Sequence, residues 1–134
     1  MKKTSSESNL ENIKAEIIEE DKKFMELVSS GDAAGLANCY TKDAKFMSAG
    51  SPAYEGRADI QKAMSEILES GITGLDVNME DIHGSEDLIA TEGLITLFAD
   101  EDAVAEEKYI ALWKKEDGRW KMFRDIFNSN SPAE

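Results

Sequence analysis

Apolar residues in the first half of the chain recur every three or four positions, which is the spacing of amphipathic helices. This spacing predicts a long helix over residues 7–29, a short helix capped by Asp32, and a third helix over residues 58–69. Between the second and third helices, residues 44–48 are a candidate for a short strand, and residues 54–55 for a further extended piece. The first half is therefore expected to be mainly helical.

From Gly74 onward the apolar residues recur every second position, which is typical of strands. Asp117 and Gly118 give a strong hairpin signal, and a two-residue loop there would place Glu116 opposite Arg119, although the same register also brings two lysines together. The pattern predicts four strands, over residues 75–82, 88–99, 108–115 and 119–128. Helices followed by an antiparallel meander indicate an α+β fold, with the helices gathered on one face of a curved sheet.

Both faces of the last two strands carry large apolar residues, whereas a sheet with one face in water alternates more strictly. One face is expected to hold Tyr109, Ala111, Trp113, Trp120, Met122 and Ile126, and the other Ile110, Leu112, Phe123 and Phe127. The helices can cover only one of these faces. A second copy of the chain is the economical cover for the other, which predicts a homodimer joined through the sheet.

The length and charge of the chain narrow the possible partners and location. Its 134 residues suit a single domain, expected over residues 7–128, with flexible termini at 1–6 and 129–134. The net charge of −13 argues against nucleic acid and against anionic membrane surfaces as partners. No apolar run is long enough to span a membrane and no apolar signal core follows the basic N-terminus, so a cytoplasmic location is expected.

Few residues are available for metal or nucleophile chemistry. Cys39 and His83 are the single cysteine and histidine of the chain, so these two residue types cannot assemble a metal site, and neither a metal nor a cofactor is expected. Cys39 is interpreted as a small apolar residue on a helix and not as a nucleophile. His83 is interpreted as an exposed loop residue. A serine nucleophile would need a histidine base, and His83 alone is available.

Two stretches of the chain resemble the SnoaL-like branch of the nuclear-transport-factor-2-like superfamily. The first comprises residues 31–36 (GDAAGL), 40–44 (YTKDA) and 56–57 (GR), and the second residues 113–122 (WKKEDGRWKM) and 124–128 (RDIFN). The resemblance implies a cone-like α+β fold, in which three N-terminal helices pack on a strongly curved antiparallel sheet and an apolar pocket opens between them. The superfamily includes polyketide cyclases, ketosteroid isomerases, dehydratases, epoxide hydrolases and non-catalytic domains, so the fold alone does not give the function.

Asp125 is the candidate for acid–base chemistry, because in the cyclase-like members an Asp on the last strand has that role and Asp125 matches its place. Strand parity puts Phe123 and Phe127 on the same face as Asp125, with Ile110 opposite. A carboxylate in such apolar company should have a raised pKa, which suits proton abstraction next to a carbonyl group. The alternative is a structural acid bonded to the backbone or to Arg57.

Two functions stay open at this point: a module that binds a small hydrophobic ligand, and a cofactor-independent enzyme of the polyketide cyclase or ketosteroid isomerase kind. In the enzyme, Asp125 would be the acid and base, and Tyr40 or Asn128 would steady the enolate oxygen. A lone carboxylate at the pocket floor would favour binding, and two or three polar groups within hydrogen-bond reach would favour catalysis. The residues expected to contact the ligand are Tyr40, Phe46, Tyr54, Arg57, Trp113, Phe123, Phe127 and Asn128.

Overall fold

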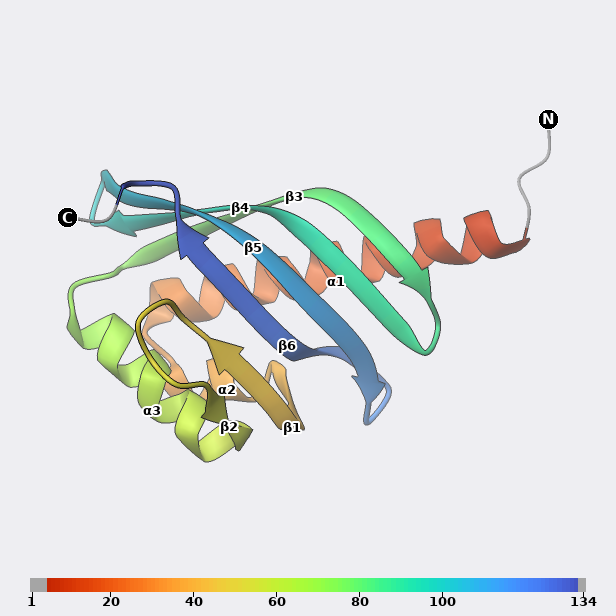
Figure 1. The fold of residues 1–134 in the computed structure, drawn as a ribbon, viewed down its shortest axis with the longest axis horizontal. Helices are drawn as coiled ribbons and strands as arrows, with labels where there is room; N and C mark the ends of the chain where they lie inside the picture. The colour runs from red at the N-terminus through yellow and green to blue at the C-terminus, as the bar shows by residue number, and fades with distance from the viewer. Residues whose placement is uncertain (1–4, 133–134) are drawn as a thin grey trace.

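Residues 5–132, which the computed structural model describes, follow the predicted order of helices and then a meander of strands (Figure 1). The helices are α1 (Ser5–Ser30), α2 (Ala33–Ala37) and α3 (Gly56–Glu69). The strands are β1 (Tyr40–Met47), β2 (Tyr54–Glu55), β3 (Gly74–Ser85), β4 (Leu88–Ala99), β5 (Asp102–Glu116) and β6 (Arg119–Ser129). The α+β class is confirmed. Among the described residues, no helix is long and apolar enough to cross a membrane.

The ends of several elements differ from their predicted positions. Helix α1 begins at Ser5 and strand β6 ends at Ser129, so both elements extend slightly beyond the predicted domain bounds of residues 7 and 128. The predictions for residues 1–4 and 133–134 lie outside the described residues. Tyr40 opens strand β1, which begins before its predicted start at residue 44, and β5 begins at Asp102, well before its predicted start at residue 108.

All the described strands join one sheet in the order β2-β1-β6-β5-β4-β3. The meander from β3 to β6 is antiparallel, as predicted. The expectation of a wholly antiparallel sheet is wrong at one strand pair inside the sheet, because β1 pairs with β6 in parallel. A parallel pair needs a long crossover, and here α3 and the meander supply it.

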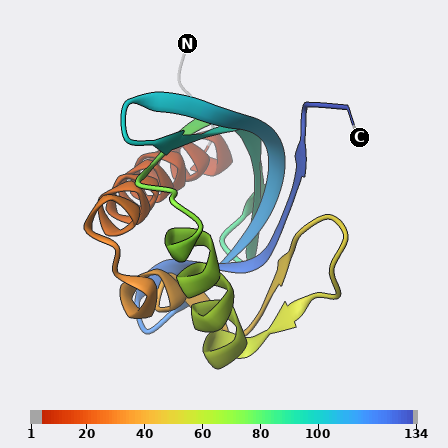
Figure 2. The same ribbon diagram turned by 90° about the vertical axis from the view of Figure 1, so that its left-hand side faces the viewer.

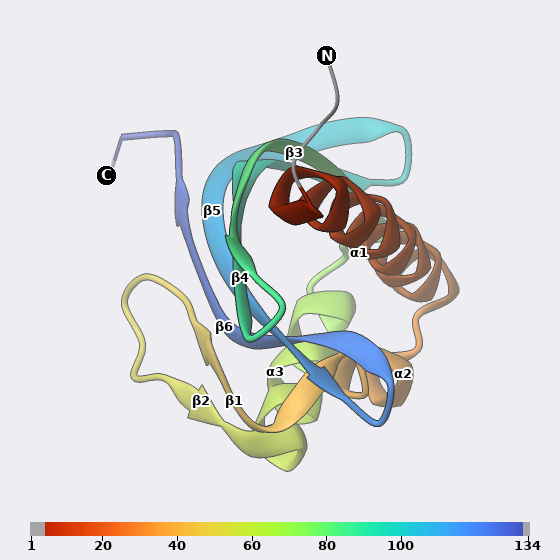
Figure 3. The ribbon, with the colours of Figure 1, turned by 90° about the vertical axis from the view of Figure 1, so that its right-hand side faces the viewer.

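The sheet curves strongly, and the helices occupy its concave side (Figures 2 and 3). Helix α1 runs along the concave face of β3–β5, while α3 lies near the edge formed by β1 and β2. Gly93 on β4 marks a tight approach to an irregularity in β3, because a Cβ atom there would lie 2.0 Å from the carbonyl oxygen of Asn78. The curvature leaves room for side chains from the helices and the sheet to converge.

The hairpin between β5 and β6 has the predicted register. Glu116 lies opposite Arg119, and the turn residues Asp117 and Gly118 have φ angles of 55° and 78°. Positive φ at both central residues fits a two-residue hairpin loop. Lys114 does lie opposite another lysine, and its Nζ sits 4.0 Å from the ring centroid of Phe123, a cation–π contact that relieves the repulsion.

A bulge in β6 changes which residues share a face. The pairing shifts between Leu112 and Trp113, so that β6 carries an extra residue at Phe123. Asp125 therefore lies opposite Ala111 and not opposite Ile110. The predicted faces are correct before the bulge and reversed after it.

The consequence is a different composition of the two faces near the end of β6. Phe127 pairs with the buried Tyr109 and belongs to the concave face, together with Asp125. Ile126 pairs with Ile110, and these two side chains are 43% and 49% exposed on the opposite, convex face. The predicted placement of Ile126 with Tyr109, and of Phe127 with Ile110, is corrected by the bulge.

Candidate functional site

A cavity of about 470 Å³ lies between the concave face of the sheet and the helices. It is lined by the C-terminal half of α1, by α2 and α3, and by residues from each of the six described strands. Strand β2 contributes Tyr54 alone. Most of the lining is aliphatic or aromatic. The aromatic rings are those of Phe24, Tyr40, Phe46, Tyr54 and Phe127.

Asp125 and Tyr40 form the polar floor of this cavity. The Tyr40 hydroxyl donates a hydrogen bond of 2.7 Å to Oδ2 of Asp125, and both residues are buried. The two come from neighbouring strands, because β1 pairs with β6 and places Phe46 beside Asp125. The Arg57 Nε donates to the Tyr40 carbonyl at 2.9 Å, which fixes the backbone that carries this tyrosine.

The environment shifts the pKa values of both groups upward. Burial raises the pKa of Asp125 to about 6, the Tyr40 hydrogen bond lowers it in part, and the charge of Glu107 adds to the rise. Burial and the adjacent Asp125 raise the pKa of Tyr40 well above its ordinary value, so its hydroxyl stays protonated and keeps its donor role. Asp125 can therefore exchange a proton near neutral pH.

Asp21 on α1 is a second buried acid close to this floor, and the sequence reasoning missed it. Burial raises its pKa to about 7, with the charges of Asp125 and Glu20 adding to the rise. No hydrogen bond or ion pair to Asp21 occurs within residues 5–132. The signal was present, because Asp21 continues the four-residue spacing of the buried Ile13 and Ile17.

Tyr109 is a further buried polar group that the sequence reasoning did not place near the site. Its hydroxyl is the single buried side-chain atom in the described part of the chain with no hydrogen-bond partner. Burial and then the charge of Asp21 raise its pKa, while the nearby Thr91 hydroxyl, which is outside good hydrogen-bond geometry, lowers it in part. An acid without a cation and a hydroxyl without a well-formed hydrogen bond thus lie close enough to Asp125 to interact with its charge.

Glu107 extends the acidic character to the wall of the cavity. It lies on β5, lines the same cavity as Asp125, and is half-buried. Burial raises its pKa. The structure gives its carboxylate no hydrogen bond or ion pair anywhere in residues 5–132.

The structure brings together five of the residues expected at the site. Asp125, Tyr40, Phe46, Tyr54 and Phe127 all line the cavity. The ring centroid of Phe46 lies 5.0 Å from that of Phe127 and 6.2 Å from that of Tyr40, so the aromatic residues form one connected wall. Whether they contact a ligand stays a prediction.

Four other expected residues lie away from the cavity lining. Arg57 forms a partly buried pair with Glu116, and the Trp113 Nε1 donates to Thr91 Oγ1 at 2.9 Å within the core. The remaining two, Phe123 and Asn128, are separated from Asp125 by the bulge and by strand parity.

Phe123 and Asn128 have clear roles elsewhere. The Phe123 ring is stacked against cations, with the Arg124 guanidinium 3.8 Å from its centroid. Asn128 is exposed and lies opposite Lys108 on β5. Phe123 therefore does not wall the cavity beside Asp125, and Asn128 does not reach the cavity floor.

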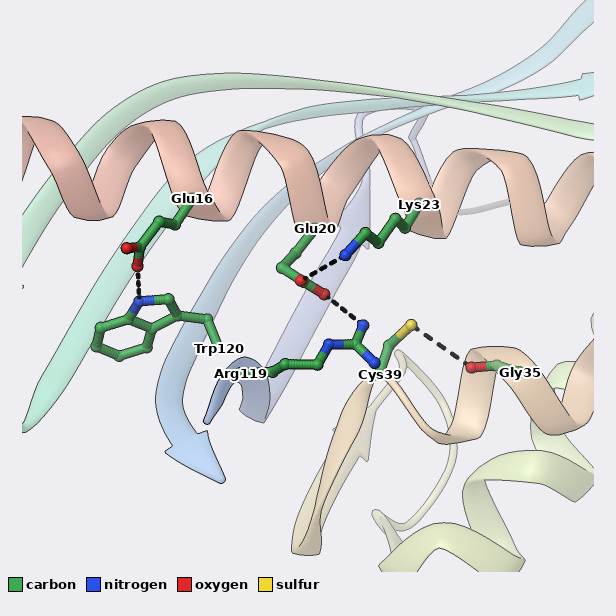
Figure 4. Close-up of polar contacts among 7 residues, drawn as sticks. All are labelled: Glu16, Glu20, Lys23, Gly35, Cys39, Arg119 and Trp120. Carbon is green, nitrogen blue, oxygen red and sulfur yellow. Dashed lines mark hydrogen bonds and ion pairs between the residues drawn. The ribbon is translucent and has the colours of Figure 1, made fainter. Parts of the chain in front are cut away.

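The cluster between α1 and the β5–β6 hairpin shows how other acids of α1 are held (Figure 4). The Trp120 Nε1 donates to Glu16 at 2.7 Å, and the Arg119 Nη2 donates to Glu20 at 2.8 Å. Lys23 adds a contact of 3.2 Å to the same Glu20 carboxylate. These bonds anchor α1 to the start of β6.

Cys39 and His83 take no part in the cavity. Cys39 follows α2, is buried, and its Sγ donates to the Gly35 carbonyl at 3.5 Å (Figure 4). Burial raises its pKa to about 11, which suppresses the nucleophilic thiolate. His83 is exposed as expected, but it lies in strand β3 and not in a loop, with Nε2 2.9 Å from Asp81. Within residues 5–132, no group of His, Cys, Asp and Glu side chains could hold a metal ion.

Comparison with known proteins supports the predicted family. The family model described as the SnoaL-like domain matches residues 22–123. No match is found among curated proteins.

Solved structures share the fold at low sequence identity. A protein of unknown function with a cystatin-like fold from Nostoc punctiforme PCC 73102 is 16% identical, with a TM-score of 0.75 over 87% of this chain and 90% of that one. A ketosteroid isomerase-like protein from Erwinia carotovora atroseptica SCRI1043 is 19% identical, with a TM-score of 0.72 over 88% and 96%. A candidate scytalone dehydratase from Novosphingobium aromaticivorans DSM 12444 is 17% identical, with a TM-score of 0.71 over 93% and 88%.

Proposed function

Because the chain belongs to the SnoaL-like domain family, we propose that it binds a small, largely apolar carbonyl compound in its cavity and moves a proton on it without a cofactor. The observation that carries the proposal is the buried Asp125–Tyr40 pair at the cavity floor. Two polar groups within hydrogen-bond reach meet the condition expected of a catalytic floor. The isomerase-like and dehydratase names of two structural neighbours agree with this class at the level of the fold alone.

Asp125 is the proposed base. Its Oδ2 accepts from Tyr40, and its Oδ1 makes no hydrogen bond within the described residues and is available to a substrate. A pKa of about 6 leaves it mainly ionised at neutral pH and close to the value at which a general base works best. It takes a proton from the carbon next to the substrate carbonyl, and the electron pair of the broken C–H bond moves into an enolate.

Tyr40 is the proposed donor to the enolate oxygen. Once Asp125 has gained the proton, its carboxyl group has less need of the Tyr40 hydrogen bond, and the hydroxyl is free to turn to the new anion. Return of the proton from Asp125 to the same or another carbon completes the exchange or the isomerisation. The charge of Asp125 also raises the pKa of the buried Asp21 on α1, so the protonation states of the two acids are coupled.

Deuterium exchange tests the chemistry without knowledge of the natural substrate. Small aryl and cyclic ketones are incubated with the protein in D₂O, and the loss of α-proton signals is followed by NMR. We expect Asp125→Asn to lower the exchange rate by about 10² to 10⁴ with little change in ligand affinity, since the change keeps the shape and removes the base. Asp76→Asn is the matched control, because Asp76 is exposed on β3 and loses the same charge outside the cavity. Equal exchange by the two variants would refute the role of Asp125.

A binding module without chemistry is the second candidate function. It is favoured by one specific observation: Tyr40 already satisfies one oxygen of Asp125, as expected for a structural pair. In that case ketones bind but no exchange above the solvent rate occurs. Asp125→Asn would then leave affinity nearly unchanged, and its main effect would be a lower melting temperature.

We also propose that the protein is a homodimer joined through the convex face of the sheet. Ile110 and Ile126 lie directly opposite each other there and are 49% and 43% exposed. Sedimentation at micromolar concentration should give about twice the chain mass of 14.8 kDa, and Ile126→Glu should dissociate the assembly. Val104→Glu is the control, because Val104 is also exposed but lies near the β4–β5 turn. A cytoplasmic location stays part of the proposal.

A further inference from the structure

The titratable groups that line the cavity are of one sign. Glu66, Glu107 and Asp125 face it together with two tyrosines, and no Lys, Arg or His is found among the described lining residues. The chain has 15 Lys and Arg residues, so the absence of cations from this surface is not a matter of composition. Arg57, which was expected to contact the ligand, is bonded to Tyr40 and Glu116 instead. A concave, apolar site lined by acids alone has a negative potential.

Glu107 is an acid in this wall with no partner of its own. Its neighbour Glu106 points to the other side of β5 and accepts from the Asn130 Nδ2 at 2.9 Å. Glu107 has no such bond within residues 5–132, although it is half-buried and lines the cavity. Burying a carboxylate without a partner is unfavourable, so a group that supplies the missing charge would stabilise it.

An aromatic surface lies next to Glu107. Glu107 pairs with Ser129 and Tyr109 pairs with Phe127, so Phe127 is the diagonal neighbour of Glu107 on the concave face. The Phe127 ring is 5.0 Å from that of Phe46, which is in turn 6.0 Å from that of Tyr54. Aromatic faces beside a carboxylate attract ammonium groups, especially where water is excluded.

We propose that the ligand of this cavity is an organic cation, a protonated or quaternary amine on an apolar skeleton, whose charge lies between the Glu107 carboxylate and the rings of Phe127 and Phe46. The assignment rests on the proposed function, in that the same molecule reaches Asp125 with its carbonyl end. The site rejects carboxylates and phosphates, because they would meet Glu107 and Asp125 with no cation in reach. The net charge of −13 attracts such cations from solution.

Three para-substituted acetophenones test this inference, because they share a shape and differ in charge: the trimethylammonium compound, its neutral tert-butyl isostere and the carboxylate. Isothermal titration at pH 7 should show the ammonium compound binding at least about tenfold more tightly than the isostere, and the carboxylate more weakly than both. Glu107→Gln should remove most of the preference and leave the isostere unaffected. Glu101→Gln is the control, because Glu101 is an exposed acid at the β4–β5 turn and loses the same charge.

Proton release gives a second reading of the same titration. The groups at or just behind the cavity wall are Asp21 from α1, Tyr40 from β1, Glu66 from α3, Glu107 and Tyr109 from β5, and Asp125 from β6. A bound cation favours the ionised carboxylates and should release protons to the buffer, whereas a neutral ligand adds burial and should not. Repeating the titration in buffers with different ionisation enthalpies shows whether protons are released or taken up on binding. Phe127→Leu keeps every charge and should weaken the binding of the ammonium compound more than the binding of the isostere.

The outcomes separate this inference from the proposed reaction. The inference is overturned if the isostere binds as tightly as the cation, if Glu107→Gln and Glu101→Gln act alike, or if none of the three compounds binds. Cation binding without deuterium exchange supports the inference and contradicts the reaction. Exchange on the tert-butyl compound with no preference for the cation supports the reaction and overturns the inference.

Discussion

Glu20 and Asp21 are adjacent in α1, yet the pKa values of their carboxyl groups are shifted in opposite directions on the two sides of the helix. Glu20 faces the β5–β6 hairpin, where burial alone would raise its pKa but the bonds and charges of Arg119 and Lys23 lower it (Figure 4). Asp21 faces the concave sheet, where burial and two nearby acids raise its pKa to about 7. Burial acts in the same direction on both residues, so the presence or absence of cations decides the result.

The comparison separates acids that hold the fold from acids that are available for chemistry. Glu16 and Glu20 accept hydrogen bonds from Trp120 and Arg119 and thereby join α1 to β6. Asp21 and Glu107, and one oxygen of Asp125, have no protein partner within the described residues. Perturbed carboxylates without structural partners, in or beside a cavity, are typical of functional sites.

The largest effect is expected from Asp21→Asn, which removes the unpaired acid and nearly keeps its shape. The pKa of Asp21 is raised from 3.8 to about 7, so the folded state binds more protons than the unfolded state between these values. Stability therefore falls as pH rises through this window, and the full penalty is present above it. We expect the variant to be more stable than the parent by about 1–4 kcal/mol at pH 8 and about equal near pH 4.

Denaturant unfolding at the two pH values measures this effect. Asp76→Asn serves again as the control, since Asp76 is exposed and should show little change at either pH. A loss of stability at pH 8 for Asp21→Asn would mean that the carboxylate is bonded in solution, and it would end the contrast with Glu20.

The next largest effect is expected from removing a tyrosine hydroxyl group at each of two buried positions, Tyr40 and Tyr109. Tyr40→Phe leaves the buried Asp125 without its donor and should cost about 1.5–3 kcal/mol, because the lost bond is to a charged group. Tyr109→Phe removes a hydroxyl that lies near Thr91 without a well-formed hydrogen bond, and it should be neutral or stabilise by about 1 kcal/mol. Tyr40→Phe should also raise the pKa of Asp125, since its hydrogen bond lowers that pKa. Calorimetry measures the stability of each variant, and NMR titration measures the pKa of Asp125. Equal stability of the two variants would show that the Tyr40 hydrogen bond does not stabilise the fold.

Three residues, Phe123 and Asp125 of β6 and Asp21 of α1, show which features of the fold and site the sequence predicts. The repeat of apolar positions and the Asp117–Gly118 signal predicted the strands and the hairpin register, because these depend on local spacing and turn geometry. The bulge at Phe123 could not be predicted, since strand parity assumes an unbroken ladder, and it moved Phe123 away from Asp125.

The pairs that bring the site together are non-local. Tyr40 meets Asp125 only because β1 joins β6 in parallel, a pairing that no short-range pattern encodes. Asp21 was available in the sequence, four residues after Ile17 on the buried stripe of α1. A search of that stripe for polar residues, as well as for apolar ones, would have found it.

The smallest effect is expected on the bonded side of the helix, from Glu20→Gln. Glu20 accepts from Arg119 at 2.8 Å and from Lys23 at 3.2 Å, but these cations are 47% and 54% exposed, so solvent screens the pairs. We expect a loss of about 0.5–1 kcal/mol at pH 7 in low salt. The lowered pKa of Glu20 stabilises the fold above its unfolded value, and this stability is lost as pH falls through the folded value. The difference from the parent should thus vanish below pH ~4, opposite to Asp21→Asn, whose difference grows toward pH 8.

Glu19→Gln provides the matched control for this variant. Glu19 pairs with Lys22 at 3.2 Å, as Glu20 does with Lys23, but both side chains are well exposed and no residue of β6 is involved. Its replacement should change the free energy of unfolding by no more than a few tenths of a kcal/mol. Urea unfolding of the parent and both variants, at pH 3.5, 5 and 8 and in low and high salt, measures the series. If Glu19→Gln costs as much as Glu20→Gln, or if the loss for Glu20→Gln is the same at every pH, the cations of the hairpin do not set the state of Glu20, and the contrast between the two sides of α1 rests on burial alone.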